Sequence, residues 1–153
     1  MFYLENGDII PNSRISSIAL GMTMEDIKTI LQGNSIDKLG GYATDIDVYK
    51  GGNVKIWLTD NKVTQISVFA NFEGKLLGEF GIGSYLTDIE KKLKVTAKEE
   101  LDVNIFDEMK GICFELSEDD NGYFDDHYEN DLYTLWAKAN LPIEIISVYS
   151  ADD

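Results

Sequence analysis

A short segment of this chain occurs twice, and the repetition restricts the possible folds more than any other feature of the sequence. Residues 20–31 align without gaps with residues 82–93, sixty-two positions later. Gly, Asp, Ile and Leu coincide at four of the twelve positions, and two more pairs are conservative. Each segment has a glycine, a polar residue and then apolar side chains at helical spacing. The sequence therefore predicts two short helices that begin alike.

The ends of the two predicted helices carry capping signals. Thr23 followed by Asp26 resembles a capping box, and Gly33 suits the left-handed position that ends many helices. Ser84 is the expected cap of the second helix. The apolar stripes expected to pack on the core are Ile27, Ile30 and Leu31 in the first helix and Leu86, Ile89 and Leu93 in the second.

Strands are expected after each helix. Residues 54–58 alternate apolar and polar side chains, Asp60-Asn61 can form a tight turn, and residues 63–70 return, which predicts a hairpin. Residues 112–116 of the second half resemble the first strand at an offset of fifty-eight positions. Residues 146–149 resemble the second strand at an offset of eighty positions. The difference of twenty-two residues predicts an insertion between the two strands of the second hairpin.

Together these features predict one α+β domain over residues 1–153. Repeat 1 spans about 15–72 and repeat 2 about 78–153, with the insertion at 117–140. Each repeat supplies a short helix and antiparallel strands, and we expect the strands to form one sheet with the helices packed on one face. Two unrelated helices in an α+β domain are the alternative.

Alternation along the strands assigns one face of the sheet to the core and leaves the other face mixed. Trp57, Phe69 and Tyr149 lie on this second face, where we expect them to contact a partner, because aromatic residues often anchor interfaces. Cross-strand aromatic pairing, or cover by the insertion, is the alternative. The core face should carry Val54, Ile56, Leu58, Ile66, Val68, Ile112, Phe114, Leu116, Ile146 and Val148, and the second face also Lys55, Ser67, Cys113, Glu115 and Ser147.

The negative charge of the chain is concentrated in one block. Thirteen of the 33 residues from Glu99 to Asp131 are acidic and one is basic, so the block carries most of the net charge of −15. Five of these acids, Glu99, Glu100, Asp102, Asp107 and Glu108, are expected in the connection before a strand. A concentrated field indicates a cationic partner or a bound cation, whereas polyphosphates and anionic membranes are repelled.

The insertion combines acids with aromatic side chains. Residues 117–131 hold seven acids, no base and three aromatics, and a short helix from Leu132 to Ala139, held to the body partly by Leu135 and Trp136, is expected to follow. We interpret the segment as a docking surface for a basic protein, because a merely soluble loop gains nothing from aromatics. The expected contact residues are Glu118, Asp119, Asp120, Tyr123, Phe124, Asp125, Asp126, Tyr128 and Glu129.

Two other interpretations of this segment stay open. Asp119, Asn121 and Gly122 fall at EF-hand calcium-loop positions, but Tyr128 occupies the last ligand position and Glu129 follows one residue too late. A solvated acidic loop without a partner is the other possibility. Because the EF-hand pattern is incomplete, we expect no metal and no other cofactor.

Catalytic and compartment signals are sparse. His127 is the only histidine and Cys113 the only cysteine, which excludes an internal disulfide and a Cys/His zinc cluster. No nucleophile motif is present, and Gly81-Ile82-Gly83 lacks the third glycine of a dinucleotide loop. We expect no enzyme, with an acid–base hydrolase as the alternative. Because the chain shows neither an export signal nor a membrane-length apolar run, we expect a cytoplasmic protein.

The two repeated segments resemble the helix start of the beta-lactamase inhibitor protein family and of small outer-membrane assembly lipoproteins. They span residues 20–27 and 82–89, and each leads through a helix to strands. This resemblance covers about half the chain and implies a helix-plus-sheet unit. The acidic character and the ending at residues 141–148 also resemble bacterial immunity proteins of contact-dependent growth inhibition and polymorphic toxin systems. That second resemblance implies a small cytoplasmic protein dedicated to one toxin domain.

The expected function is therefore that of an immunity or inhibitor protein for a basic toxin domain of the nuclease type. Its acidic and aromatic side chains would cover the toxin surface that binds phosphates. A non-catalytic scaffold or assembly module, which would bind a protein partner through the aromatic sheet face alone, is the alternative.

Overall fold

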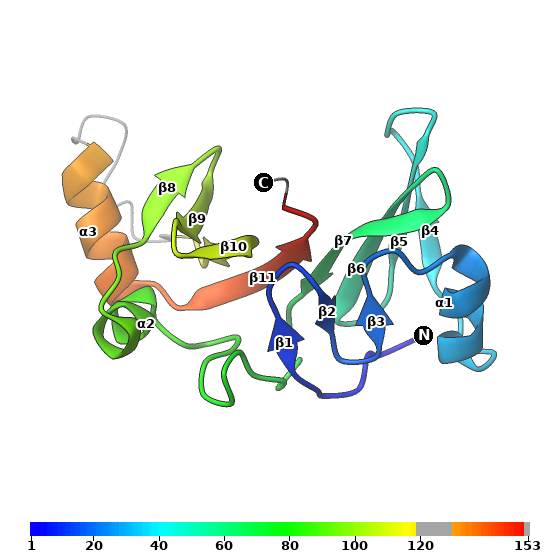
Figure 1. Ribbon diagram of the computed structural model, residues 1–153, viewed down its shortest axis with the longest axis horizontal. Helices are drawn as coiled ribbons and strands as arrows, with labels where there is room; N and C mark the ends of the chain where they lie inside the picture. The colour runs from blue at the N-terminus through cyan, green and yellow to red at the C-terminus, as the bar shows by residue number, and fades with distance from the viewer. Residues whose placement is uncertain (119–129, 152–153) are drawn as a thin grey trace.

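An eight-stranded antiparallel sheet forms the body of the protein, whose fold is α+β (Figure 1). The computed structural model describes residues 1–118 and 130–151. The strands of the large sheet are β4 (Asp37–Leu39), β5 (Ile46–Lys50), β6 (Val54–Thr59), β7 (Lys62–Val68), β8 (Lys98–Glu100), β9 (Val103–Phe106), β10 (Met109–Leu116) and β11 (Ile143–Tyr149). The helices are α1 (Met24–Leu31), α2 (Leu86–Leu93) and α3 (Asn130–Asn140).

The strand order places the two halves of the chain side by side. Neighbouring strands run in the order β4-β5-β6-β7-β11-β10-β9-β8, so each half enters at one edge and ends at the centre. At the centre, β7 and β11 pair with Ser67 opposite Ser147, while Ile66 faces Val148 and Val68 faces Ile146. The central pairing is thus symmetric about the two serines.

The starts of α1 and α2 are attached to the sheet by equivalent hydrogen bonds. The Gly21 amide donates to the Val63 carbonyl and the Gly83 amide donates to the Ile143 carbonyl, both at 2.8 Å. Each strand residue in turn donates to the residue after the glycine. Both glycines have a φ near +90° (88° and 93°), a conformation that side chains disfavour, which explains why glycine occurs at both positions.

The two helices differ in how they begin. Thr23 caps α1 with the predicted capping box to Asp26. The prediction that Ser84 caps α2 is wrong: Tyr85 is the N-cap and makes no side-chain cap bond. The Ser84 hydroxyl instead accepts a hydrogen bond from the Gly81 amide at 3.0 Å, which closes the preceding turn.

The expected core face is confirmed. Nine of its ten predicted side chains are buried and Leu116 packs against them partly buried. Asp60 and Asn61 form the predicted turn, and both have positive φ, as a two-residue hairpin requires. Buried residues of α1 and α2, among them Ile27 and Ile89, belong to the same hydrophobic cluster, so the two helices pack on the core side of the sheet.

Three parts of the fold differ from the predictions. Strands β1 (Ile9–Ile10), β2 (Arg14–Ile15) and β3 (Ile18–Ala19) form a second small sheet, so the strands do not form one sheet. The outer strands β4, β5, β8 and β9 also extend the large sheet beyond the expected hairpins. The five acids at 99–108 therefore lie in and between paired strands, not in one connection. These strands are short or charged, so alternation does not reveal them.

Helix α3 lies in the connection between β10 and β11 and confirms the predicted helix. The expected packing through Leu135 is wrong, since its side chain is 61% exposed. Ala137 and Lys138 face inward instead. The Lys138 ammonium lies 2.8 Å from the Glu90 carboxylate of α2 and 3.2 Å from the Ala97 carbonyl, and the same carboxylate accepts the Ala97 amide at 2.8 Å. A buried ion pair therefore fastens α3 to α2.

Candidate protein-binding groove

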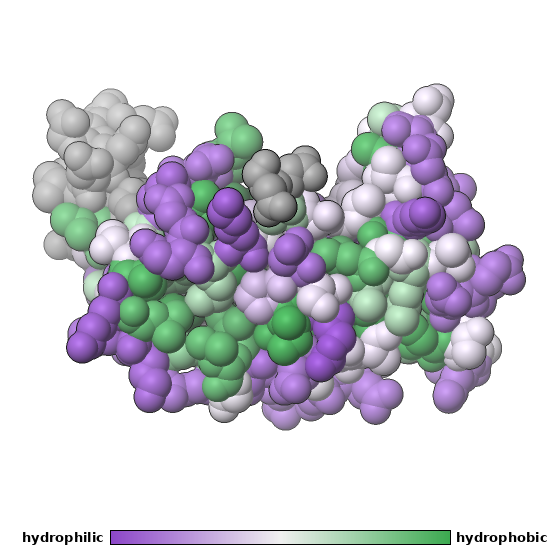
Figure 2. Space-filling view, in the orientation of Figure 1, coloured by the Kyte–Doolittle hydropathy of each residue, from purple (hydrophilic) through white to green (hydrophobic). Residues whose placement is uncertain are grey.

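The sheet face opposite the core is hollowed between its raised outer strands. Figure 1 shows β4–β5 and β8–β9 rising on either side of the central strands, and Figure 2 shows a notch between two raised ends. Two adjoining hollows of about 310 and 330 Å³ share Gln65 and Glu115, and we call them together the groove. The first is also lined by Lys50, Lys55, Trp57, Ser67, Phe69 and Ile145, and the second by Glu100, Leu101, Val103, Ile105, Cys113, Ser147 and Tyr149.

The floor of the groove consists of side chains aligned across the strands. Gln65 of β7 pairs with both Trp57 of β6 and Tyr149 of β11, which places an amide between two aromatic side chains. In the next row, Lys55, Ser67, Ser147 and Cys113 follow one another across four strands. The two serine hydroxyls hydrogen-bond to each other at the centre of this row. Direct cross-strand neighbours lie on one face, so these residues form a continuous surface.

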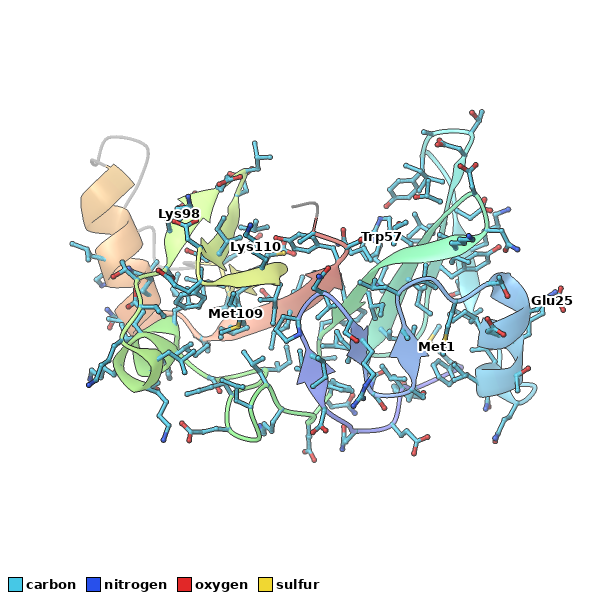
Figure 3. The ribbon with its side chains drawn as sticks, in the orientation of Figure 1. Met1, Glu25, Trp57, Lys98, Met109 and Lys110 are labelled. Atoms are coloured by element: carbon cyan, nitrogen blue, oxygen red, sulfur yellow. The ribbon has the colours of Figure 1, made fainter. Side chains whose placement is uncertain are left out.

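The three aromatic residues predicted to bind a partner lie on this face. Trp57 and Phe69 line the first hollow and Tyr149 lines the second, and all three are partly buried. Figure 3 shows Trp57 at the notch, on the side of the sheet away from the core. The sequence-based expectation that these side chains share one surface is consistent with their placement.

Of the acidic residues predicted for the same role, Glu118 lies within the described ranges, and it is not among the residues that line the groove. Glu118 is exposed and lines a separate hollow of about 200 Å³ with Glu99 and Asp102, beside α3. The other predicted contacts, and the residues of the calcium interpretation between them, lie outside the described ranges: Asp119, Asp120, Tyr123, Phe124, Asp125, Asp126, Tyr128 and Glu129.

The sequence-based interpretation missed several residues that line the groove or stand beside it. Leu101 stands at the tip of the β8–β9 hairpin with 91% of its surface exposed, and Tyr42 lies in the loop between β4 and β5 with 45% exposed. Val103 and Ile105 line the second hollow from β9. The alternation of residues 103–106 was a usable signal, but it was hidden inside the acidic block.

The charged side chains of the groove occupy its two halves unequally. Lys50 and Lys55 line the first hollow, and Glu100 and Glu115 line the second, where no basic side chain is present among its lining residues. Burial raises the pKa of Glu115, and the nearby Glu144 raises it further against the opposing effect of Lys55. Burial likewise raises the pKa of the Tyr149 hydroxyl. Burial acts in this direction because it disfavours the charged form of each group.

Cys113 lies on the same floor, and its thiol is buried. Burial raises its pKa to about 11, although the hydrogen bond with Ser147 favours the thiolate. At pH 8 this corresponds to about a hundredfold less thiolate than an ordinary thiol holds. We expect iodoacetamide to modify the folded protein at least about a hundredfold more slowly than the urea-unfolded protein. The rate for the folded protein should rise about tenfold per pH unit. Mass spectrometry can follow the reaction, since the chain has one cysteine; equal rates in both states would contradict the burial.

Comparisons with protein families, with characterised proteins and with solved structures found no match for this chain. In residues 1–118 and 130–151, no helix has the length and apolarity needed to cross a membrane. No group of three or more His, Cys, Asp or Glu side chains within those ranges is arranged to hold a metal ion.

Proposed function

We propose that this protein is a non-catalytic, cytoplasmic immunity or inhibitor protein that neutralises a basic toxin domain, of the nuclease type, by covering its active surface. The observation that carries the proposal is the groove, in which Trp57, Phe69 and Tyr149 lie partly buried on a sheet face that no described helix covers. Partly buried aromatic side chains in a concave surface are the usual anchors of protein interfaces. A partner that fills the groove would bury them.

The edges of the groove support the same function. Tyr42 and Leu101 project apolar side chains from the loops that end the two outer hairpins. Exposed apolar surface is unfavourable in water, so its burial under a partner would stabilise the complex. The two tips lie on opposite halves of the sheet, so a partner seated in the groove can contact both.

The acidic part of the chain accounts for the choice of a basic partner. Carboxylates of residues 118–129 would occupy positions on the toxin that otherwise receive phosphates, with Tyr123, Phe124 and Tyr128 as anchors. Glu100 and Glu115 add negative charge inside the second hollow. Concentrated negative charge accelerates association with a basic surface and disfavours nucleic acid.

We further propose that the two halves are tandem repeats, and that the segment 117–140 was added to the second repeat as its recognition element. The mirrored strand order, the symmetric pairing about Ser67 and Ser147, and the equivalent hydrogen bonds of Gly21 and Gly83 support this history. A duplicated sheet is wider than one unit, which creates a face broad enough for a partner.

A second candidate is a scaffold module that binds its partner through the groove and is indifferent to the acidic segment. It is favoured by one observation: Trp57 lies in β6, Phe69 directly follows β7 and Tyr149 ends β11, so strands of the sheet place all three aromatic side chains in the groove. The two candidates are separated by deleting the acidic segment, because binding would survive only in the scaffold.

The proposed function has a genetic test. We expect the reading frame beside this gene to encode a chain that ends in a basic domain, and we expect that domain to stop growth when expressed alone. Co-expression of this protein should restore growth, and the two proteins should purify together. Continued growth arrest with both proteins present would overturn the proposal.

Trp57→Ala is expected to weaken binding of that toxin domain by about thirtyfold or more, since truncating a central aromatic anchor commonly costs about 2 kcal/mol or more. Titration calorimetry measures the affinity. Leu77→Ala is the control, because Leu77 is an exposed apolar residue outside the groove lining. This variant should bind the toxin domain with unchanged affinity. Equal affinities for both variants would show that the groove is not part of the interface.

Reversal of Asp125 and Asp126 to lysine is expected to slow association by about an order of magnitude at low salt, because the steering field is reduced while the aromatic contacts remain. Stopped-flow measurements at low salt and at high salt test this, and thermal melting monitors folding. If neither the reversal nor added salt changes the association rate, the scaffold candidate is favoured.

A further inference from the structure

The first hollow of the groove is lined by two neighbouring lysines, although the chain as a whole is strongly acidic. Lys50 and Lys55 stand directly opposite each other on β5 and β6, and both line the hollow. Like charges at directly paired positions destabilise a sheet. The chain has 28 acidic residues and only 13 Lys and Arg, yet among the described residues the only carboxylate that lines this hollow together with the two lysines is that of Glu115.

Neither lysine forms an ion pair within the described ranges. Their ammonium groups lie against aromatic rings instead: Lys50 is 5.6 Å from the centre of the Phe69 ring, and Lys55 is 4.8 Å from that of Trp57 and 5.9 Å from that of Tyr42. Cation–π contacts hold the positive charges in place without neutralising them.

We propose that Lys50 and Lys55 form a seat for a carboxylate of the bound protein, presented beside an apolar side chain. A carboxylate between the two ammonium groups would remove their repulsion, while Trp57, Phe69 and Ile145 would receive the apolar group next to it. Ser67 and Gln65 line the same hollow and supply polar groups at its floor.

The seat also fixes the direction in which the partner lies. Glu115 stands on the opposite wall of the first hollow, and Glu100 and Glu115 line the second. A partner must therefore place its carboxylate over β5 and β6, and hydrogen-bond donors or basic side chains over β8 and β10. This seat rests on the proposed function: the occupant is the toxin domain, and this basic domain carries an acidic residue at the point of contact.

A small aromatic acid tests the seat without the toxin. We expect 3-phenylpropionate, titrated into the ¹⁵N-labelled protein, to shift the backbone amide signals of Lys55, Ser67 and Phe69. The neutral isostere 3-phenylpropanamide should bind at least fivefold more weakly. Lys50→Met with Lys55→Met should lower the affinity for the acid at least fivefold, whereas Lys50→Arg with Lys55→Arg should preserve it.

The matched control is Lys28→Met with Lys62→Met, which removes the same charge from exposed positions outside the groove lining and should leave binding unchanged. Equal binding of the acid and the amide, or an equal loss in the control pair, would overturn the seat. In the complex, Lys50→Glu with Lys55→Glu should weaken toxin binding at least tenfold. Growth rescue by this protein combined with no preference for the acid would reject the seat and leave the proposed function intact.

Discussion

Replacing Lys138 with alanine is expected to lower the free energy of unfolding by about 3–5 kcal/mol, because it leaves the Glu90 carboxylate buried without its cation. The two side chains are only 6% and 17% exposed, and their charged atoms lie 2.8 Å apart. Water can therefore do little to compensate for the lost ammonium group. Urea denaturation followed by circular dichroism measures the change.

Two further variants separate the ion pair from its surroundings. Glu90→Gln combined with Lys138→Met removes both charges and keeps an oxygen that can accept the Ala97 amide, so most of the stability should return. Lys92→Met is the surface control, since Lys92 and Glu79 pair at 3.8 Å with more than half of each side chain exposed, and should change stability by less than about 1 kcal/mol. A loss in the double variant as large as in Lys138→Ala would show that charge pairing is not the cause.

Replacing Phe114 with alanine is expected to destabilise the protein by about 3–5 kcal/mol. Its side chain is fully buried, and its ring meets that of Phe106 edge to face with centres 5.8 Å apart. The substitution removes a large apolar surface and leaves a cavity at a site that neighbouring strands hold rigidly. Urea denaturation is again the measurement, and Leu101→Ala, at an exposed tip, should remain within about 0.5 kcal/mol of the parent.

The same experiment tests whether the two halves fold together. Phe114 and Ile56 lie in different halves of the chain but in one hydrophobic cluster. Ile56→Ala should therefore shift the same single transition by about 2–5 kcal/mol and produce no second transition. Two separate transitions, each sensitive to one variant, would contradict a shared core.

The stability of α3 bears on the proposed interface. Helix α3 begins where the acidic segment ends in the chain, and Lys138 is its charged contact with α2. Loss of that contact should loosen the attachment of one end of the segment. Lys138→Ala is therefore expected to affect binding of the proposed toxin domain as well as folding, whereas Phe114→Ala acts through folding.

Local patterns in the sequence determined the central elements of the fold. Thr23 with Asp26, Asp60 with Asn61, and the alternation from Val54 to Leu58 predict a cap, a turn and a strand, and all three are present. Each of these depends on residues within one turn of helix or one strand, so the chain carries the information locally. The shared surface of Trp57, Phe69 and Tyr149 follows from the same alternation.

Features that the sequence did not predict depend on contacts between distant residues or on backbone geometry. Strand β8 consists of Lys-Glu-Glu and has no apolar pattern, because it is an exposed edge strand that needs none. Glu90 and Lys138 are separated by 48 positions, and nothing near either residue indicates the other. Ser84 looked like a cap but bonds to the preceding turn, a choice set by backbone geometry.

The sequence by itself determined two glycine-led helices, the core face of the strands and the aromatic character of the opposite face, because short-range periodicity encodes them. Only the tertiary structure decided that the halves join through Ser67 and Ser147, that the outer hairpins raise the edges of a groove, and that Lys50 and Lys55 meet inside it. The junction at Ser67 and Ser147 joins segments 80 positions apart in the chain, and the hollow that Lys50 and Lys55 line is completed by Glu115 and Ile145 of the other half. Pairing depends on the packing of the whole core, which no local pattern records.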